Sequence, residues 1–339
     1  MKELVGKLSA LDPEAGDALK VVTYFDTLMD GRVSLETLVR GAATLSGTAA
    51  GYRRGATSIR VLADGRRAPA IGEIDFATTA AGDGAVVWLE RAGAAHANDE
   101  MIRERLAVAI AQSAARGSEQ SPERHAVELL LTAPHDDAQR VAAEARLQLE
   151  PRSRVRAVAL PNRRSPLRDF PSAVMATPWG IVRGGIVPAR FAPASTSGSG
   201  SASGAIGIGF EGRLSELPSS WRSALVALAL AGDGPSRADD FGSLIALATP
   251  ITDSEELPAD LAALESASDH GWTVPVLQAI ADGESVRGIA AVAGLHHSSV
   301  HARLPELTRL LTFDPLTPLG RTRLYATLLL RRIATARFD

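Results

Sequence analysis

A helical pattern that glycines interrupt is the feature of this sequence that most constrains its fold. Apolar residues recur at helical spacing over 273–311, and Gly294 breaks the pattern in the middle. Ser285 is of a residue type that caps helix N-termini, so we expect it to cap a short helix over 286–293. A longer helix should then begin near His297 or Ser298. A short helix, a glycine turn and a longer helix form the helix-turn-helix pattern.

The longer helix is expected to have one apolar face and one polar face. Its apolar residues, which recur at helical spacing, are Val300, Leu304, Leu307 and Leu311. In a DNA-binding helix-turn-helix the second helix points its N-terminal residues at base edges, and the first helix with its cap meets phosphates. The residues that this geometry selects are Ser285, Arg287, His297, Ser298, His301 and Arg303. A second interpretation is a plain helical bundle whose polar face is only solvated.

Charge is distributed unevenly along the 339 residues. Residues 271–339 contain eight arginines and five acidic residues, a net charge of +3, whereas the whole chain carries −3. Cysteine is absent, which excludes disulfides and cysteine-based zinc sites. We also find neither an apolar run of the ~18 residues that span a membrane nor a secretion signal, and we therefore expect a cytoplasmic protein without a membrane partner.

The first segment, 1–117, alternates helical and strand-like patterns and predicts a small α/β unit. Helices are expected over 19–29, 34–45 and 99–113, and strands over 50–53, 58–62, 72–77 and 85–90. A small-molecule effector pocket there would be mostly apolar with a few polar groups. The candidate effector-binding residues are Tyr52, Arg60, Phe76 and Trp88. The alternative is that these aromatic residues belong to the core.

A linker over 118–124 is expected to precede a second α/β segment, 125–258. Its predicted helices are 137–149 and 220–231, and its predicted strands are 154–160 and 205–210. A hairpin is expected across 176–190 with its turn at Gly184-Gly185, and a flexible loop over 195–204. A G-x-G-x-x-G pattern begins at Gly207, but the helix that a dinucleotide site requires does not open at these glycines. We therefore expect no dinucleotide site.

The C-terminal residues resemble a known family. The stretch GESVRGIAAVAGLHHSSVHARLPELTRLLTFDP, followed by RLYATLLLRRI, is similar to the DNA-binding domain of PucR/CdaR transcription regulators. The resemblance covers about 65 residues and adds His296 and Ser299 to the candidate DNA-binding residues. Three positions depart from it, because His297, Ser298 and His301 stand where the family favours Arg, Asn and Arg. Pro305 also lies inside the expected recognition helix, where we expect a kink or an early end.

The family layout extends the interpretation to the whole chain. The segment 1–117 resembles a GAF-like sensor domain, and 125–258 resembles a degenerate GGDEF-like domain. The resemblance implies a multidomain α/β (α+β) fold with an all-α helix-turn-helix domain over 265–339. His297 and His301 have metal-ligand spacing but lack a third ligand, so no metal or other cofactor is expected.

The function that follows is a one-component transcription regulator and not an enzyme. It would bind promoter DNA, respond to an unidentified small molecule, and act as a homodimer or higher homo-oligomer. Two alternatives stay open. The helix-turn-helix could serve protein interaction instead of DNA binding, or the middle segment could handle nucleotides as an enzyme, although its acidic metal ligands are missing.

Overall fold

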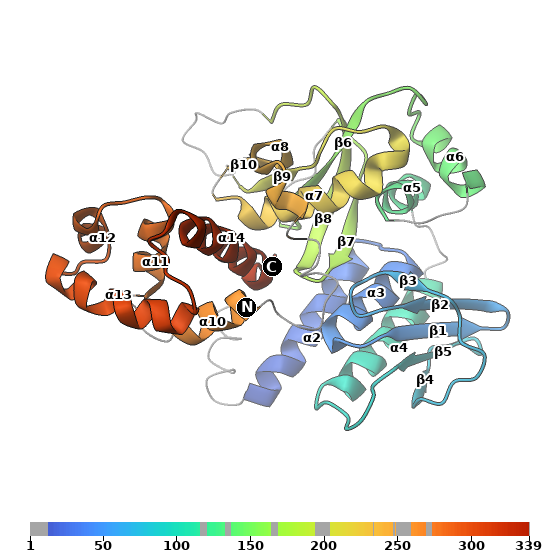
Figure 1. Ribbon diagram of the computed structural model, residues 1–339. Coiled ribbons are helices and arrows are strands. Elements are labelled where there is room, and N and C mark those ends of the chain that lie inside the picture. The colour runs from blue at the N-terminus through green and yellow to red at the C-terminus, as the bar shows by residue number, and fades with distance from the viewer. Residues whose placement is uncertain are drawn as a thin grey trace. The chain divides into compact units, whose positions relative to one another are not determined.

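The computed structural model (Figure 1) describes residues 13–115, 121–132, 137–163, 169–193, 204–232, 234–246, 248, 259–268 and 273–338. The chain forms two compact units. Unit 1 comprises Met1–Asp240 with Arg337–Asp339, and unit 2 comprises Phe241–Ala336. Unit 1 contains two β-sheets with helices, and the region from α10 to α14 in unit 2 is helical. The predicted α+β class with a helical C-terminal region is confirmed, and the division into three domains stays a prediction.

The first sheet of unit 1 is antiparallel, with strand order β3-β2-β1-β5-β4. The strands are β1 (Ala50–Arg54), β2 (Thr57–Val61), β3 (Arg67–Ala68), β4 (Thr78–Ala80) and β5 (Val86–Leu89). Three helices share one apolar core with this sheet: α2 (Pro13–Asp30), α3 (Leu35–Ser46) and α4 (Asp99–Ala115). Ser34 caps α3 as predicted, because its Oγ accepts a hydrogen bond from the Thr37 N–H.

One strand of the first sheet was predicted wrongly. Residues 72–77 form a loop, and the short strand β4 follows them. The Arg53 side chain accounts for this difference. Its guanidinium donates hydrogen bonds to the carbonyl oxygens of Gly72, at 2.9 Å, and of Ile71. These carbonyls are thus paired with a side chain, and not with the backbone of a neighbouring strand.

The second sheet of unit 1 has strand order β10-β9-β6-β8-β7, in which only β9 and β10 are parallel. Its strands are β6 (Val155–Pro161), β7 (Ser172–Thr177), β8 (Gly180–Pro188), β9 (Ile206–Ile208) and β10 (Pro235–Arg237). The helices of this part are α5 (Pro122–Leu131), α6 (Asp137–Arg146), α7 (Leu217–Leu230) and the short α8 (Ala238–Phe241). The first residues of α5 overlap the predicted linker, and most of the predicted loop 195–204 lies outside the described residues.

The turn of the β7–β8 hairpin lies at the two residues between Thr177 and Gly180, and not at Gly184-Gly185 as predicted. Gly180, with φ of +116°, begins β8, and Gly184 lies within that strand. A Cβ at Gly184 would lie 2.7 Å from Leu131 of α5 and 3.1 Å from Trp221 of α7. The glycine therefore allows both helices to pack closely on this face of the sheet. A glycine is usually interpreted as a turn signal, and this interpretation does not reveal the packing role of Gly184.

The two sheets of unit 1 are joined through shared apolar packing. Val174 and Ala176 of β7 and Ile181 of β8 belong to the same buried cluster as the side chains of α2, α3 and α4. Val174 also packs against the end of α2, where a Cβ added to Gly31 would lie 3.0 Å from the Val174 Cβ. The second sheet thus has α5 and α7 on one face and part of the first core on the other.

The G-x-G-x-x-G segment serves close packing between β9 and α7. A Cβ at Gly207 would lie 2.0 Å from the Ala224 carbonyl oxygen, and one at Gly209 would lie 2.0 Å from the Ser220 carbonyl oxygen. Both contacts involve helix backbone, which cannot rotate away as a flexible side chain can. The glycines are therefore explained by the approach of a helix to a strand.

Gly207→Ala is expected to lower the free energy of unfolding by about 1–3 kcal/mol, because the new methyl group must displace α7 from the sheet. Urea unfolding followed by circular dichroism measures this loss. Gly232→Ala is the matched control, since a Cβ there would meet no atom within 4 Å. Equal stabilities of the two variants would contradict the packing explanation.

No described helix has both the length and the apolar character that crossing a bilayer requires.

Candidate nucleic-acid interface

Unit 2 packs its helices around one apolar core. The helices are α10 (Ala259–Ala267), α11 (Thr273–Ala281), α12 (Val286–Val292), α13 (His297–Leu311) and α14 (Pro318–Thr335), coloured orange to red in Figure 1. The buried side chains come from all five, and include Leu264, Leu277, Ile289, Ala290, Val300, Leu307, Leu311 and Leu324. The predicted apolar face of the longer helix is confirmed, because Val300, Leu307 and Leu311 are buried and Leu304 packs against them.

Helix α12 begins and ends as the sequence predicts. Ser285 caps it, and its Oγ accepts a hydrogen bond of 3.2 Å from the Gly288 N–H. At the other end Gly294 adopts the left-handed conformation, with φ of +65°. The Leu295 N–H donates to the Ala290 carbonyl and the Gly294 N–H donates to the Ala291 carbonyl. This pair of bonds is a Schellman motif, which stops the helix and turns the chain sharply.

Helix α13 begins at His297, in agreement with the prediction, and His296 is its N-cap residue. The His296 carbonyl accepts from the backbone N–H groups of Ser299 and Val300. The His296 Nδ1 and the Ser298 Oγ lie 2.7 Å apart, within hydrogen-bond distance. The rings of His296 and His297 have centroids 4.3 Å apart. The first turn of α13 is therefore a connected polar group rather than three independent side chains.

Pro305 does not end α13 early, so that alternative was wrong. The helix continues through Pro305 to Leu311. Proline lacks an N–H, so the His301 carbonyl loses its usual helical donor. Both residues are exposed, and water can hydrogen-bond this carbonyl instead. The predicted kink stays a prediction.

Most of the candidate DNA-binding residues lie at the surface. Six are exposed, namely Ser285, Arg287, His296, His297, Ser298 and His301, and two are half-buried, namely Ser299 and Arg303. The turn at Gly294 brings the end of α12 to the start of α13, where the three histidines and Ser298 are clustered. The cap of α12 and the first turns of α13 thus present hydrogen-bonding groups to solvent.

Three charged residues of this region were not among the residues predicted from the sequence. Arg309 lies 11 residues after Ser298, which is three helical turns and places both on one side of α13. Glu306 is exposed on the same helix, and Glu284 is exposed immediately before the cap Ser285. Both carboxylates would repel phosphates, and they offset the charges of Arg287 and Arg309. Helical spacing from Ser298 was the signal that could have identified Arg309.

The four candidate effector-binding residues do not converge on one face of the first sheet. Tyr52 pairs with Val87 across β1 and β5, and it belongs to the core between the sheet and the helices. Trp88 pairs with Gly51 and therefore lies on the opposite face, together with Arg60, which is the partner of Gly51 in β2. A Cβ at Gly51 would lie 2.0 Å from the Trp88 ring. Phe76 is half-buried in the loop before β4.

Trp88 and Arg60 are joined through Glu90. The Arg60 guanidinium donates two hydrogen bonds to the Glu90 carboxylate, at 2.7 and 2.6 Å, and the Trp88 Nε1 donates a third at 3.1 Å. The hydrogen bonds from Arg60 hold the pKa of the Glu90 carboxyl below its usual value. They also raise the pKa of Arg60. The polar groups of this face are therefore engaged with one another.

Similarity to known proteins is found among solved structures. No protein-family model matches the chain, and no curated protein matches it. Among solved structures, the chain is similar to a regulator of polyketide synthase expression from Bifidobacterium adolescentis. The identity is 18%, the match covers 64% of this chain and 100% of that protein, and the TM-score is 0.29. This score does not establish a common fold.

Proposed function

We propose that the chain is a transcription regulator that binds duplex DNA through α12 and α13. One observation carries this proposal: the exposed polar N-terminal turns of α13 follow a capped short helix and a Schellman turn at Gly294. In this arrangement the second helix can enter the major groove, with Ser298 and His301 toward base edges. Arg287 on the first helix is suited to a phosphate contact.

The remaining functional expectations belong to the same proposal. Unit 1 would bind a small-molecule effector, and the protein would act without catalysing a reaction. A single helix-turn-helix contacts few base pairs, so we propose that two copies bind a two-fold symmetric site. We do not expect unit 2 to bind DNA strongly without regard to sequence, because its exposed arginines are few and Glu284 and Glu306 offset part of their charge.

The test is selection of duplexes from a random library by the full chain, followed by fluorescence anisotropy on the enriched sequence. His301→Ala and Ser298→Ala are each expected to weaken binding about 10-fold or more, because each removes a group that faces base edges. Arg287→Ala is expected to weaken binding to all sequences similarly. It should also reduce by about one the slope of the logarithm of the affinity against the logarithm of the salt concentration.

His96→Ala is the control for this series, since His96 is an exposed histidine of unit 1. The proposal fails if selection enriches no sequence, or if the α13 variants bind the enriched sequence as tightly as the parent protein and the His96 variant do.

A protein-interaction role for the same surface is the second candidate. Val292, at the end of α12, is 63% exposed, and an apolar side chain beside the polar turn suits a protein partner. Salt distinguishes the two candidates, because DNA binding weakens steeply as salt concentration rises.

A further inference from the structure

A pocket of about 330 Å³ lies in unit 1, between α3, β3 and the helices α5 and α6. Its buried lining includes Ser34, Ala126, Glu128 and Ala143, and its exposed lining includes Arg67 and Arg146. The volume is near the lower limit for small-molecule sites in proteins. This pocket was not predicted from the sequence, and none of its residues is among the effector candidates.

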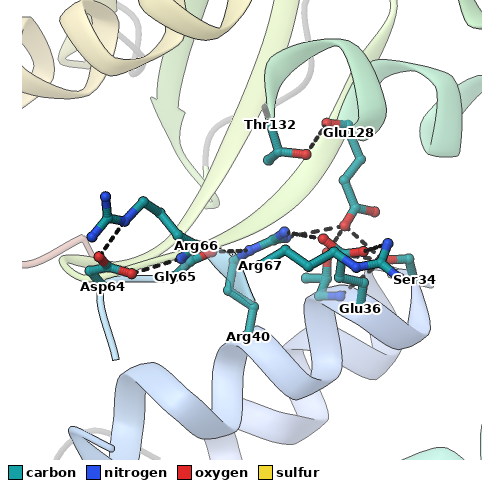
Figure 2. Close-up of polar contacts among 10 residues, drawn as sticks. Ser34, Glu36, Arg40, Asp64, Gly65, Arg66, Arg67, Glu128 and Thr132 are labelled. Atoms are coloured by element: carbon teal, nitrogen blue, oxygen red, sulfur yellow. Dashed lines mark hydrogen bonds and ion pairs between the residues drawn. The ribbon is translucent and has the colours of Figure 1, made fainter. Parts of the chain in front are cut away.

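Figure 2 shows the polar contacts that connect three of the lining residues, Ser34, Glu36 and Glu128, with Arg40. Arg40 of α3 donates to three acceptors: the Gly65 carbonyl at 2.9 Å, Glu36 at 2.6 Å and Glu128 at 3.3 Å. Arg67 of β3 donates to the other oxygen of Glu36 at 3.1 Å. The carboxylate of Glu36 is therefore held by two arginines, one buried and one exposed.

Glu128 differs from Glu36 because its hydrogen bonds converge on one oxygen. Among the described residues, Ser34 donates to Oε1 at 2.7 Å, Thr37 donates to the same atom, and Arg40 is the third donor. The second oxygen, Oε2, receives no hydrogen bond from the described part of the chain. The Glu128 side chain is 7% exposed and lines the pocket. An oxygen without a hydrogen-bond donor, in a largely buried carboxylate that lines a pocket, favours a donor, and a cationic donor most strongly.

The opposite charge lies at the exposed end of the pocket. Arg146, the last residue of α6, is exposed and forms no ion pair with the residues that the structure describes. Arginine can bind a carboxylate with two parallel hydrogen bonds. The side chains of Ala126, Leu129, Ala142 and Ala143 supply apolar lining to the same pocket. The lining of the pocket therefore combines a largely buried carboxylate, apolar side chains and an exposed guanidinium.

We propose that this pocket binds a free amino acid, with the ammonium group on Glu128 and the carboxylate on Arg146. A zwitterion matches both groups, because its ammonium group can donate to the second oxygen of Glu128 and its carboxylate can accept from Arg146. A ligand with only one of these charges would leave one of the two groups without a partner. The apolar wall suits a ligand with a small aliphatic body. The site lies wholly in unit 1, so this proposal does not depend on DNA binding by unit 2.

The test is a thermal-shift screen of the full chain with the standard α-amino acids, β-alanine and γ-aminobutyrate at millimolar concentration. At least one compound is expected to raise the melting temperature, as ligand binding to the native state requires. The comparison of α- with longer amino acids reports the spacing of the two charges. The N-acetyl and amide derivatives of the active compound each lack one charge and are expected to have little effect.

Calorimetric titration of the active compound then assigns the residues. Arg146→Gln is expected to weaken binding about 10-fold or more, because a charge-assisted hydrogen bond is lost. Arg222→Gln, an exposed arginine of α7, is the control and should leave the affinity unchanged. Glu128→Gln should weaken binding also, once circular dichroism shows that this variant is folded.

Three results would overturn the proposal. The first is a screen in which no amino acid raises the melting temperature. The second is binding of the N-acetyl or amide derivative with the affinity of the parent compound. The third is an affinity that Arg146→Gln leaves unchanged, and this result does not depend on whether the Glu128 variant folds. None of these results bears on the DNA selection experiment.

Discussion

Replacing Arg40 with alanine is expected to lower the free energy of unfolding by about 3–5 kcal/mol, because it leaves the buried Glu128 carboxylate without its cation. The Arg40 and Glu128 side chains are 5% and 7% exposed. Arg40 also donates to Glu36 and to the Gly65 carbonyl, so its removal deprives three acceptors of a donor. Urea unfolding followed by circular dichroism measures the loss.

Two further variants show whether burial is the cause. Lys20→Ala removes an ion pair with Asp17 whose side chains are 65% and 50% exposed, and should change stability by less than about 1 kcal/mol. Adding Glu128→Gln to Arg40→Ala should restore part of the lost stability, since the uncompensated charge disappears. A loss for Arg40→Ala no larger than that for Lys20→Ala would show that the network contributes little.

Trp88→Ala is also expected to lower the free energy of unfolding by about 3–5 kcal/mol, the range for a large aromatic side chain removed from a core. Trp88 is 0% exposed and lies against Gly51, where only a glycine leaves room for its ring. The Arg53 guanidinium lies 5.7 Å from the ring centroid on the same side of the sheet.

Phe76→Ala is the control for this prediction. Phe76 is only half-buried, so its removal should lower the free energy of unfolding by less than the removal of Trp88. Trp88→Phe keeps a ring in the site but removes the donor to Glu90, and is expected to give an intermediate loss. If the free energy of unfolding of Trp88→Ala lies within about 1 kcal/mol of that of the parent protein, the ring would not be part of the packed structure. Such a result would favour a role for Trp88 in ligand binding instead.

Local signals predicted the helices well and the sheets less well. Ser34 and Ser285 were identified as caps because the hydrogen bond they make is to a residue three positions away. Gly294 was identified as a turn because a glycine interrupts the helical pattern there. The position of β4 and the turn between β7 and β8 depend on contacts with Arg53, Leu131 and Trp221, which lie far away in sequence. Periodicity within a short window does not contain such contacts.

The candidate sites divide in the same way. The polar face of α13 could be predicted because Ser298, His301 and Val300 lie within one helix, whose period fixes which residues are exposed. The pocket in unit 1 could not, because Arg40 and Glu128 are 88 residues apart and their pairing depends on how α5 packs. Their burial also conceals them, since an arginine and a glutamate in a helical segment are usually interpreted as surface residues.

The shared core of the two sheets has a consequence for how unit 1 can respond to a ligand. Val174 and Ile181 occupy the same close-packed interior as α2 and α3, and Gly31 leaves no free space beside Val174. Close-packed interiors transmit displacement because they have little room to absorb it. If occupation of the pocket moves α3, the β7–β8 hairpin is therefore expected to move with it, because the interface between them has no space that could absorb the displacement.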